Sequence, residues 1–125
     1  MDWGQVPADI EEKLRAICLA LPDAHEQDAW NGRRWLIRKR TFAHVFAVER
    51  LEGPVPMMQF RSDPPEFEAL VRSGHPFFKA GWGTNVLAMI FDDRTDWDEV
   101  AELVADSYCS QAPKKLAAVV NGHVN

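Results

Sequence analysis

Several features that would assign a chemistry are scarce or absent in this chain of 125 residues. It has two cysteines, Cys18 and Cys109, without a Cys-x-x-Cys spacing, so neither a zinc site nor a redox motif is indicated and both are expected to be free thiols. No apolar run approaches the ~20 residues that span a bilayer. The N-terminal segment is acidic and lacks the apolar core of a secretory signal. These absences predict a cytoplasmic protein that does not bind a membrane.

Catalytic and metal-binding patterns are missing as well. There is no G-x-S-x-G motif, no glycine-rich phosphate loop and no recognisable serine–histidine–acid set. His44 lies in an apolar strand pattern, where a hydrogen-bonded sheet residue is expected, and His25 and His123 have no recognisable partner. The acidic run "DDRTDWDE" lacks the glycine and the distal glutamate of an EF-hand calcium loop and suits a helix N-terminus. Asp98, Glu99, Glu102 and Asp106 then form a solvated helix face, for which a weak iron- or partner-binding ridge is the alternative. We therefore expect no enzymatic activity, no catalytic residue, no metal and no cofactor.

The remaining composition is that of an ordinary globular domain. Hydrophobic residues make up 46% of the chain and charged residues 26%, and the length fits one domain. We expect a single domain over residues 1–125, with a core at about 7–118 and a frayed tail at 119–125. The formal net charge of −5 argues against broad, non-specific nucleic-acid binding, which usually needs a basic excess.

Three segments have helical patterns. Apolar residues between positions 10 and 21 recur at spacings of three and four. The segment "SDPPEFEALVRSG" predicts a second helix that Asp63 caps and Gly74 ends. A third helix is expected from an N-cap at Thr95 to Pro113, and "KKLAAVV" can add a short final turn.

Strand patterns fill the remaining sequence. "RWLIRKR", "FAHVFAVE" and "VPMMQFR" follow the first helix, "TNVLAMIF" precedes the last one, and "EQDAW" can form a shorter strand. The Asn31-Gly32 dipeptide is typical of two-residue hairpins. The order α-β-β-β-α-β-α with hairpin-length connections predicts a two-layer α+β domain, in which helices cover one face of an antiparallel sheet.

The segment "NGRRWLIRKR" concentrates positive charge. Its cationic residues are Arg33, Arg34, Arg38, Lys39 and Arg40. In a continuous strand, alternate side chains share a face. One face then holds Arg34, Leu36, Arg38 and Arg40, and the other holds Trp35, Ile37 and Lys39. Because the second face is mostly apolar, we expect the first to lie on the open side of the sheet.

This basic row has more than one interpretation. Arginine forks match phosphate oxygens, so the hairpin can contact a nucleic-acid backbone. Open faces of antiparallel sheets are also commonly charged, and Glu26, Asp28 and Glu49 can neutralise the row from neighbouring strands. A protein partner is the third interpretation.

The loop "HPFFKAGWGTNV" places Trp82 between two glycines. Together with Lys79, this indole can stack on bases or accompany a phosphate contact. Alternatively, Trp82 and the preceding phenylalanines close the end of the core. A small-molecule pocket under the loop is a further alternative.

Four features of the sequence are similar to the YjbR/MmcQ-like family. They are "AICLALPDAHE", a hairpin with a tryptophan and basic residues, a late tryptophan followed by "TNV", and "SYCSQAPKKLA". The resemblance extends from about Ile10 to Leu116. It implies an antiparallel sheet packed by helices, related to secretion-chaperone-like architectures. It also implies a small bacterial cytoplasmic protein of a group commonly labelled DNA-binding, without agreed catalytic residues.

The sequence departs from that pattern in one loop. Many relatives carry a histidine directly before the late tryptophan, whereas Gly81 stands there in this chain and Gly83 intervenes before "TNV". The remaining candidates in the loop are Lys79, Trp82 and Asn85.

The working hypothesis is DNA binding through phosphate contacts. The expected contacts are Arg33, Arg34, Arg38, Lys39 and Arg40, with Lys79 and Trp82 as accessories. One alternative is a protein-interaction module or homodimer that uses the open sheet face. The other is a small-molecule binder with its pocket under the "KAGWG" loop.

Overall fold

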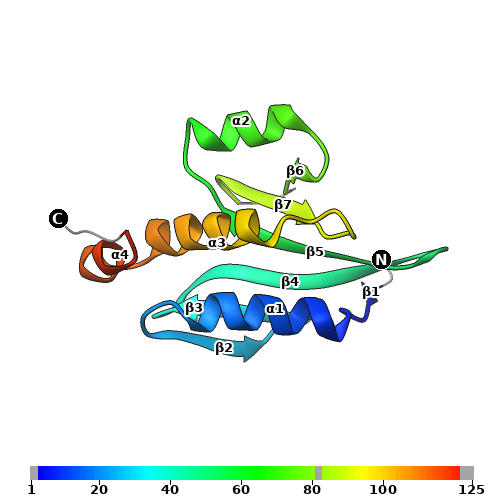
Figure 1. Ribbon diagram of the computed structural model, residues 1–125, viewed down its shortest axis with the longest axis horizontal. Coiled ribbons are helices and arrows are strands. Elements are labelled where there is room, and N and C mark those ends of the chain that lie inside the picture. Colours follow the sequence, from blue (N-terminus) through cyan, green and yellow to red (C-terminus); the bar gives the residue numbers. More distant parts are fainter. Residues whose placement is uncertain (1–2, 81–82, 122–125) are drawn as a thin grey trace.

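A single antiparallel sheet organises the chain, which the computed structural model describes over residues 3–80 and 83–121. Figure 1 shows the arrangement of its helices and strands. In chain order the elements are β1 (Trp3–Gly4), α1 (Ala8–Leu19), β2 (Ala24–Asp28), β3 (Arg33–Ile37), β4 (Arg40–Arg50), β5 (Gly53–Arg61), α2 (Glu66–Ser73), β6 (Phe77–Lys79), β7 (Val86–Ile90), α3 (Trp97–Gln111) and α4 (Lys114–Val120).

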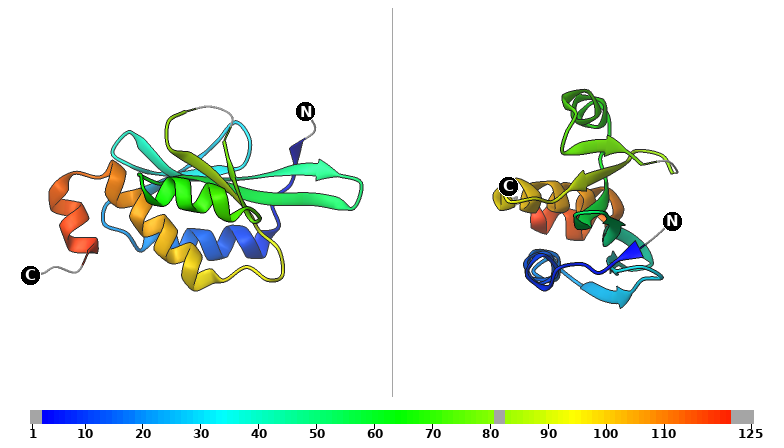
Figure 2. Two further views of the ribbon diagram at one scale, coloured as in Figure 1. Left: turned by 90° about the horizontal axis from the view of Figure 1, so that it is seen from above. Right: turned by 90° about the vertical axis from the view of Figure 1, so that its right-hand side faces the viewer.

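The strands pair in the order β2-β3-β4-β5-β7-β6, and β1 pairs with β4 beyond the end of β3. In the end-on view of Figure 2, α1 and α3 lie on one side of the sheet, and α2 lies at its β6 end. Within the described part of the chain, no helix covers the other face. The predicted α+β fold is therefore confirmed. The sequence did not reveal β1 and β6, because two or three residues are too few to establish an alternating pattern.

The core lies between the sheet and the helices. Its fully buried helical side chains include Leu14, Cys18, Val100, Val104 and Tyr108. Trp35 and Ile37 of β3 are also fully buried, which confirms the apolar face predicted for this strand. On α3, the Tyr108 ring packs edge to face against Phe42, with 5.3 Å between the ring centroids. Because this face of the sheet is buried against the helices, the opposite face is the one open to solvent.

Two helix starts differ from the predictions. Asp63 makes no side-chain cap hydrogen bond to α2, which begins at Glu66. Helical backbone angles are unfavourable for a residue that precedes proline, and two prolines follow Asp63. The helix therefore begins only after them. At α3 the N-cap is Asp96, whose carboxylate accepts from two backbone amides, whereas the Thr95 hydroxyl accepts from the backbone of Asp92.

The two helix ends were predicted correctly. Gly74 follows α2 with φ 78°, a backbone conformation that favours glycine. Pro113 separates α3 from α4, which contains the "KKLAAVV" segment. The residues that follow Asn121 at the end of the expected frayed tail lie outside the described part of the chain.

The predicted strand through residues 34–40 is interrupted. β3 ends at Ile37, and Arg38 and Lys39 form the turn to β4, with Arg38 at φ 58°. The pairing of β3 with β4 also shifts between Trp35 and Leu36. Arg34 therefore lies in one strand, Arg38 in a turn and Arg40 at the start of the next strand. The expected row of three arginines on one strand face was wrong, and Leu36 is buried.

The connection from β2 to β3 is longer than a two-residue hairpin. It spans residues 29–32 and is closed by a hydrogen bond from the Ala29 amide to the Gly32 carbonyl at 3.1 Å. Gly32 has φ 81°, and a Cβ there would overlap the carbonyl oxygen of Val45. A side chain at position 32 would thus displace the loop from β4.

Both cysteines are free thiols, as predicted, with Cys18 buried in the core. Burial raises the pKa of the Cys18 thiol. Over residues 3–80 and 83–121, no helix has the length and apolar content of a membrane span. No cluster of three or more metal-ligating side chains occurs in the same ranges.

Candidate nucleic-acid interface

The sheet face opposite the helices contains a groove of about 820 Å³. Arg34, His44 and Gln59 are direct cross-strand neighbours on β3, β4 and β5, and all three line it. Their chain neighbours Trp35 and Val45 point the other way, into the core. The alternation of each strand therefore places these three side chains on the open face. From there the groove extends to the core residues Phe42 and Phe60 and to Gln111 at the end of α3.

Four cationic side chains line the groove. They are Arg34, Lys39, Arg40 and Arg61. None of the ion pairs formed among the described residues involves any of them. The single carboxylate in the described lining is Asp28, which is paired with Arg33 at 2.6 Å. The groove therefore carries net positive charge in an acidic protein.

Arg34 has one donor without a protein acceptor. Its Nη2 donates to Oε1 of Gln27 on β2 at 2.9 Å, which fixes the direction of the side chain. Its Nε is buried and has no hydrogen-bond partner among the described residues. Since a buried unpaired donor costs free energy, a rotation of this side chain that brings Nε to an anionic oxygen in the groove would be favourable.

Arg61 reaches the groove from the last position of β5. Its Nη1 donates to the Thr84 carbonyl at 3.0 Å, and its backbone amide donates to Oγ of Ser107 at 2.8 Å. The Ser107 hydroxyl in turn donates to the Phe42 carbonyl at 2.6 Å. Helix α3 thus holds β4 and β5 together where Arg61 and Arg40 approach the groove.

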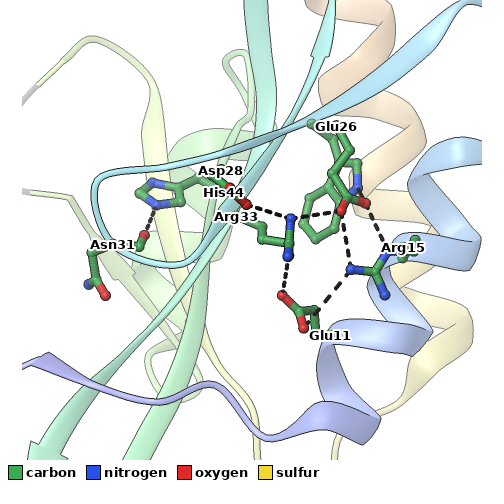
Figure 3. Close-up of polar contacts among 8 residues, drawn as sticks. Glu11, Arg15, Glu26, Asp28, Asn31, Arg33 and His44 are labelled. Atoms are coloured by element: carbon green, nitrogen blue, oxygen red, sulfur yellow. Dashed lines mark hydrogen bonds and ion pairs between the residues drawn. The ribbon is translucent and has the colours of Figure 1, made fainter.

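Arg33 has a different environment from Arg34. Its guanidinium is bound by three carboxylates, at 2.7 Å from Glu11, 2.6 Å from Asp28 and 3.1 Å from Glu26 (Figure 3). This matches the interpretation in which neighbouring carboxylates neutralise the basic segment, but it applies to Arg33 alone. Glu49 takes part in none of the ion pairs among the described residues.

Glu26 is the centre of this network. Arg15 of α1 donates to it twice, from Nε at 2.9 Å and from Nη2 at 3.1 Å, and the buried Trp35 donates from its indole at 2.9 Å. The hydrogen bonds from Arg15 lower the pKa of Glu26, and partial burial opposes them. The network joins α1 to β2 and β3 on the helix side, so its function is structural.

His44 lies beside Arg34 and holds the loop that precedes β3. Its Nε2 lies 2.6 Å from the Asn31 carbonyl (Figure 3), and because a carbonyl only accepts, Nε2 is the donor. Burial lowers the pKa of His44, the bond to Asn31 opposes this, and the charge of Arg34 lowers it further. The expected hydrogen-bonded sheet histidine is therefore present.

Trp30 stands at the rim of the groove. It is 88% exposed, although it is the largest type of apolar side chain. The Trp3 ring meets it edge to face with 5.8 Å between centroids, and Trp3 also meets Phe46 at 5.9 Å. The indole is thus fixed at one side and open to solvent over most of its surface.

A sequence profile of the YjbR family matches residues 19–110. The chain belongs to the YjbR family. The matched part begins at the last residue of α1 and ends one residue before the last of α3, so it includes all four groove cations. A search of curated proteins returned no match.

In this YjbR domain, the structure separates the residues predicted from sequence. Arg34, Lys39 and Arg40 share the groove, whereas Arg33 lies in the ion-pair network and Arg38 lies in the turn outside the groove lining. Lys79 is exposed on β6, at the opposite edge of the sheet from β2. Trp82, and with it the tip of the loop proposed to cover a small-molecule pocket, lies outside the described residues.

Sequence reasoning missed Arg61 and Trp30 in the YjbR domain. Arg61 is the final residue of the "VPMMQFR" strand and lies two positions after Gln59, hence on the same face. That alternation is visible in the sequence, but the pairing of Gln59 with His44 is not. Trp30 was assigned to the end of a strand, whereas it lies in the longer connection before β3.

Proposed function

We propose that this YjbR-family domain binds nucleic acid by holding phosphates in the groove of the open sheet face. The observation that carries the proposal is the convergence of Arg34, Lys39, Arg40 and Arg61, none of them ion-paired within the described residues. Guanidinium groups present donors in a fork that fits phosphate oxygens, and lysine adds a point charge. DNA is the form to be tested first.

The net charge of −5 is compatible with this proposal because the charges are segregated. Carboxylates gather at the start of α3, where Asp98 and Glu99 occupy its first turn, and around Arg33 on the helix side. The acidic surface outside the groove weakens the long-range attraction between the protein and a nucleic acid, so we expect a modest affinity. Four phosphate contacts predict a slope of about −2.8 to −3.6 for log K against log salt, at roughly −0.7 to −0.9 per phosphate.

The proposal is for a binding domain and not for an enzyme. It places the protein in the cytoplasm, where thiols stay reduced, and both Cys18 and Cys109 are free. Cell fractionation of the tagged protein tests the location. Assays with nuclease and phosphatase substrates test the lack of catalysis, and turnover that the groove variant described below abolishes would refute it.

The binding experiment is fluorescence anisotropy with labelled single-stranded and duplex DNA at several salt concentrations. The groove variant replaces its four cations by alanine: R34A, K39A, R40A and R61A. A matched control, R50A, R72A, R94A and K115A, changes the net charge equally at exposed positions outside the groove. We expect micromolar binding that the groove variant weakens at least tenfold, with a shallower salt slope, and that the control retains. No binding at low salt, or an equal loss in both variants, would refute the proposal.

A second candidate function is suggested by an apolar cluster on the same face. Phe46, Val48 and Met57 pack together there, with Val55 and Ile90 beside them. Phe46, Val48 and Met57 are themselves buried, so the apolar surface that a protein partner or a second copy of the chain could cover here is that of the half-buried Val55 and Ile90. Sedimentation of the protein alone tests self-association, which should then respond weakly to salt and strongly to the variant V55D. Leu36 is not part of this candidate surface, because it is buried.

A further inference from the structure

Trp30 adds a feature to the groove that phosphate binding does not require. A tryptophan that is 88% exposed leaves a large apolar surface in water, and here that surface borders the four cations. Trp3 packs edge to face against Trp30 and also against Phe46, so the Trp30 ring is anchored to the sheet through Trp3. The Trp30 ring is therefore held in place by Trp3 while most of its surface stays open at the groove.

The loop under Trp30 is also held in place. The His44 ring donates to the Asn31 carbonyl at 2.6 Å, and the Ala29 amide bonds to the Gly32 carbonyl at 3.1 Å. Gly32 packs so closely on β4 that no side chain fits there. Ordering the loop therefore costs little at the moment of binding, which makes the Trp30 ring a prepared contact surface.

A flat aromatic ring beside a row of cations is the combination that binds unpaired nucleic-acid strands. Aromatic rings stack on base faces, and neighbouring cations hold the backbone that connects those bases. In a duplex, the base faces are covered by their stacked neighbours, so Trp30 would have no partner there. The volume of about 820 Å³ falls in the range of ligand pockets, which suits a short stretch of a single strand.

We infer that the groove binds single-stranded nucleic acid, with one base stacked on Trp30 and the adjoining phosphates on Arg34, Lys39, Arg40 and Arg61. This inference rests on the proposed function and specifies the form of its ligand. Stacking accepts every base, so the binding should show little sequence preference. Gln59 also lines the groove on the same face, and its amide can make a secondary contact to a base edge.

Three probes of equal length separate the contributions: a labelled thymidine oligomer, the same backbone with abasic sites, and a duplex. Each is titrated by anisotropy into the wild type, W30A, W30F and the groove variant. Stacking on an aromatic side chain corresponds to roughly a 5- to 160-fold change in affinity. We expect the thymidine oligomer to bind the wild type tighter than the abasic strand and the duplex by a factor in this range.

W30A should lower the affinity for the thymidine oligomer to that for the abasic strand and leave the salt slope unchanged. W30F should keep most of the difference. Because position 30 is exposed, both variants should give the circular dichroism spectrum of the wild type. Equal affinity for abasic and thymidine strands, or preference for the duplex, with a normal salt slope would overturn this inference alone. Absence of binding to all three probes would overturn the proposed function as well.

Discussion

Two adjacent arginines in this protein have different environments. Arg33 points toward the helix layer and is bound by Glu11, Glu26 and Asp28, whereas Arg34 points toward the open face with its Nε unpaired among the described residues. Strand alternation predicts that the two diverge. It does not predict the partners, because Glu11 lies 22 positions away in the sequence. Charge clustering in a sequence thus overestimates the charge available for binding.

Substitution of Arg33 should lower the stability of the fold, whereas substitution of Arg34 should weaken DNA binding. R33A removes a cation from three carboxylates, so the free energy of unfolding should fall by on the order of 1 kcal/mol, since the network is partly exposed. R34A should leave stability nearly unchanged and weaken DNA binding severalfold. Urea denaturation and anisotropy on both variants test this pair. Equal effects of both variants on binding would contradict the separation.

His44 should make stability depend on pH in a defined direction. Its folded pKa is lowered, chiefly by burial, whereas the unfolded value is about 6.5. Above that value the imidazole is neutral in both states, and its full contribution is present. As the pH falls, the unfolded chain takes up the proton first, so stability is lost as the pH drops through the folded pKa.

The variant H44Q tests this effect because its amide can still donate to Asn31. Between about pH 7.5 and pH 5, the wild type should lose more unfolding free energy than H44Q, as measured by urea denaturation. H25Q, at an exposed position on β2, is the control and should behave as the wild type. An identical pH dependence in the wild type and H44Q would show that His44 does not contribute.

At the scale of the elements, long periodic segments were predicted well and short ones were not. The apolar stripe of α1 and the alternation in β3 identified Leu14, Cys18, Trp35 and Ile37 as buried, because apolar residues recur at the expected spacing. The alternation also placed Leu36 on the open face, and this was wrong because Leu36 is buried. β1 and β6 contain two and three residues, and their existence depends on pairing with β4 and β7. The turn at Arg38 and Lys39 was missed because neither residue type is typical of positive φ.

The start of α3 offers a test at this scale. Asp96 accepts from the amides of Asp98 and Glu99, at 3.0 and 3.3 Å. D96A should lower the free energy of unfolding by about 1 kcal/mol, and D96S, which restores an N-cap acceptor, should recover most of it. Urea denaturation measures both. If D96S is as unstable as D96A, the loss does not arise from the cap.

At the scale of the molecule, the groove combines residues from distant segments. Trp30 comes from the loop after β2, Arg34 from β3, Arg40 from β4 and Arg61 from β5. The sequence pointed to the basic segment, but the register of the sheet decides which cations meet. Family membership agrees with the predicted fold and leaves the ligand open, so the groove itself has to be tested.

The most direct test observes the groove arginines themselves. In correlation spectra of the arginine Nε–H groups, assigned with single Arg-to-Lys variants, the protein is titrated with a DNA oligomer. The signals of Arg34 and Arg61 should shift together with one dissociation constant, because phosphate oxygens become their acceptors. Those of Arg72 and Arg94, exposed outside the groove, should stay in place. If Arg34 and Arg61 do not move at saturation, or if all four move equally, the groove is not the binding site.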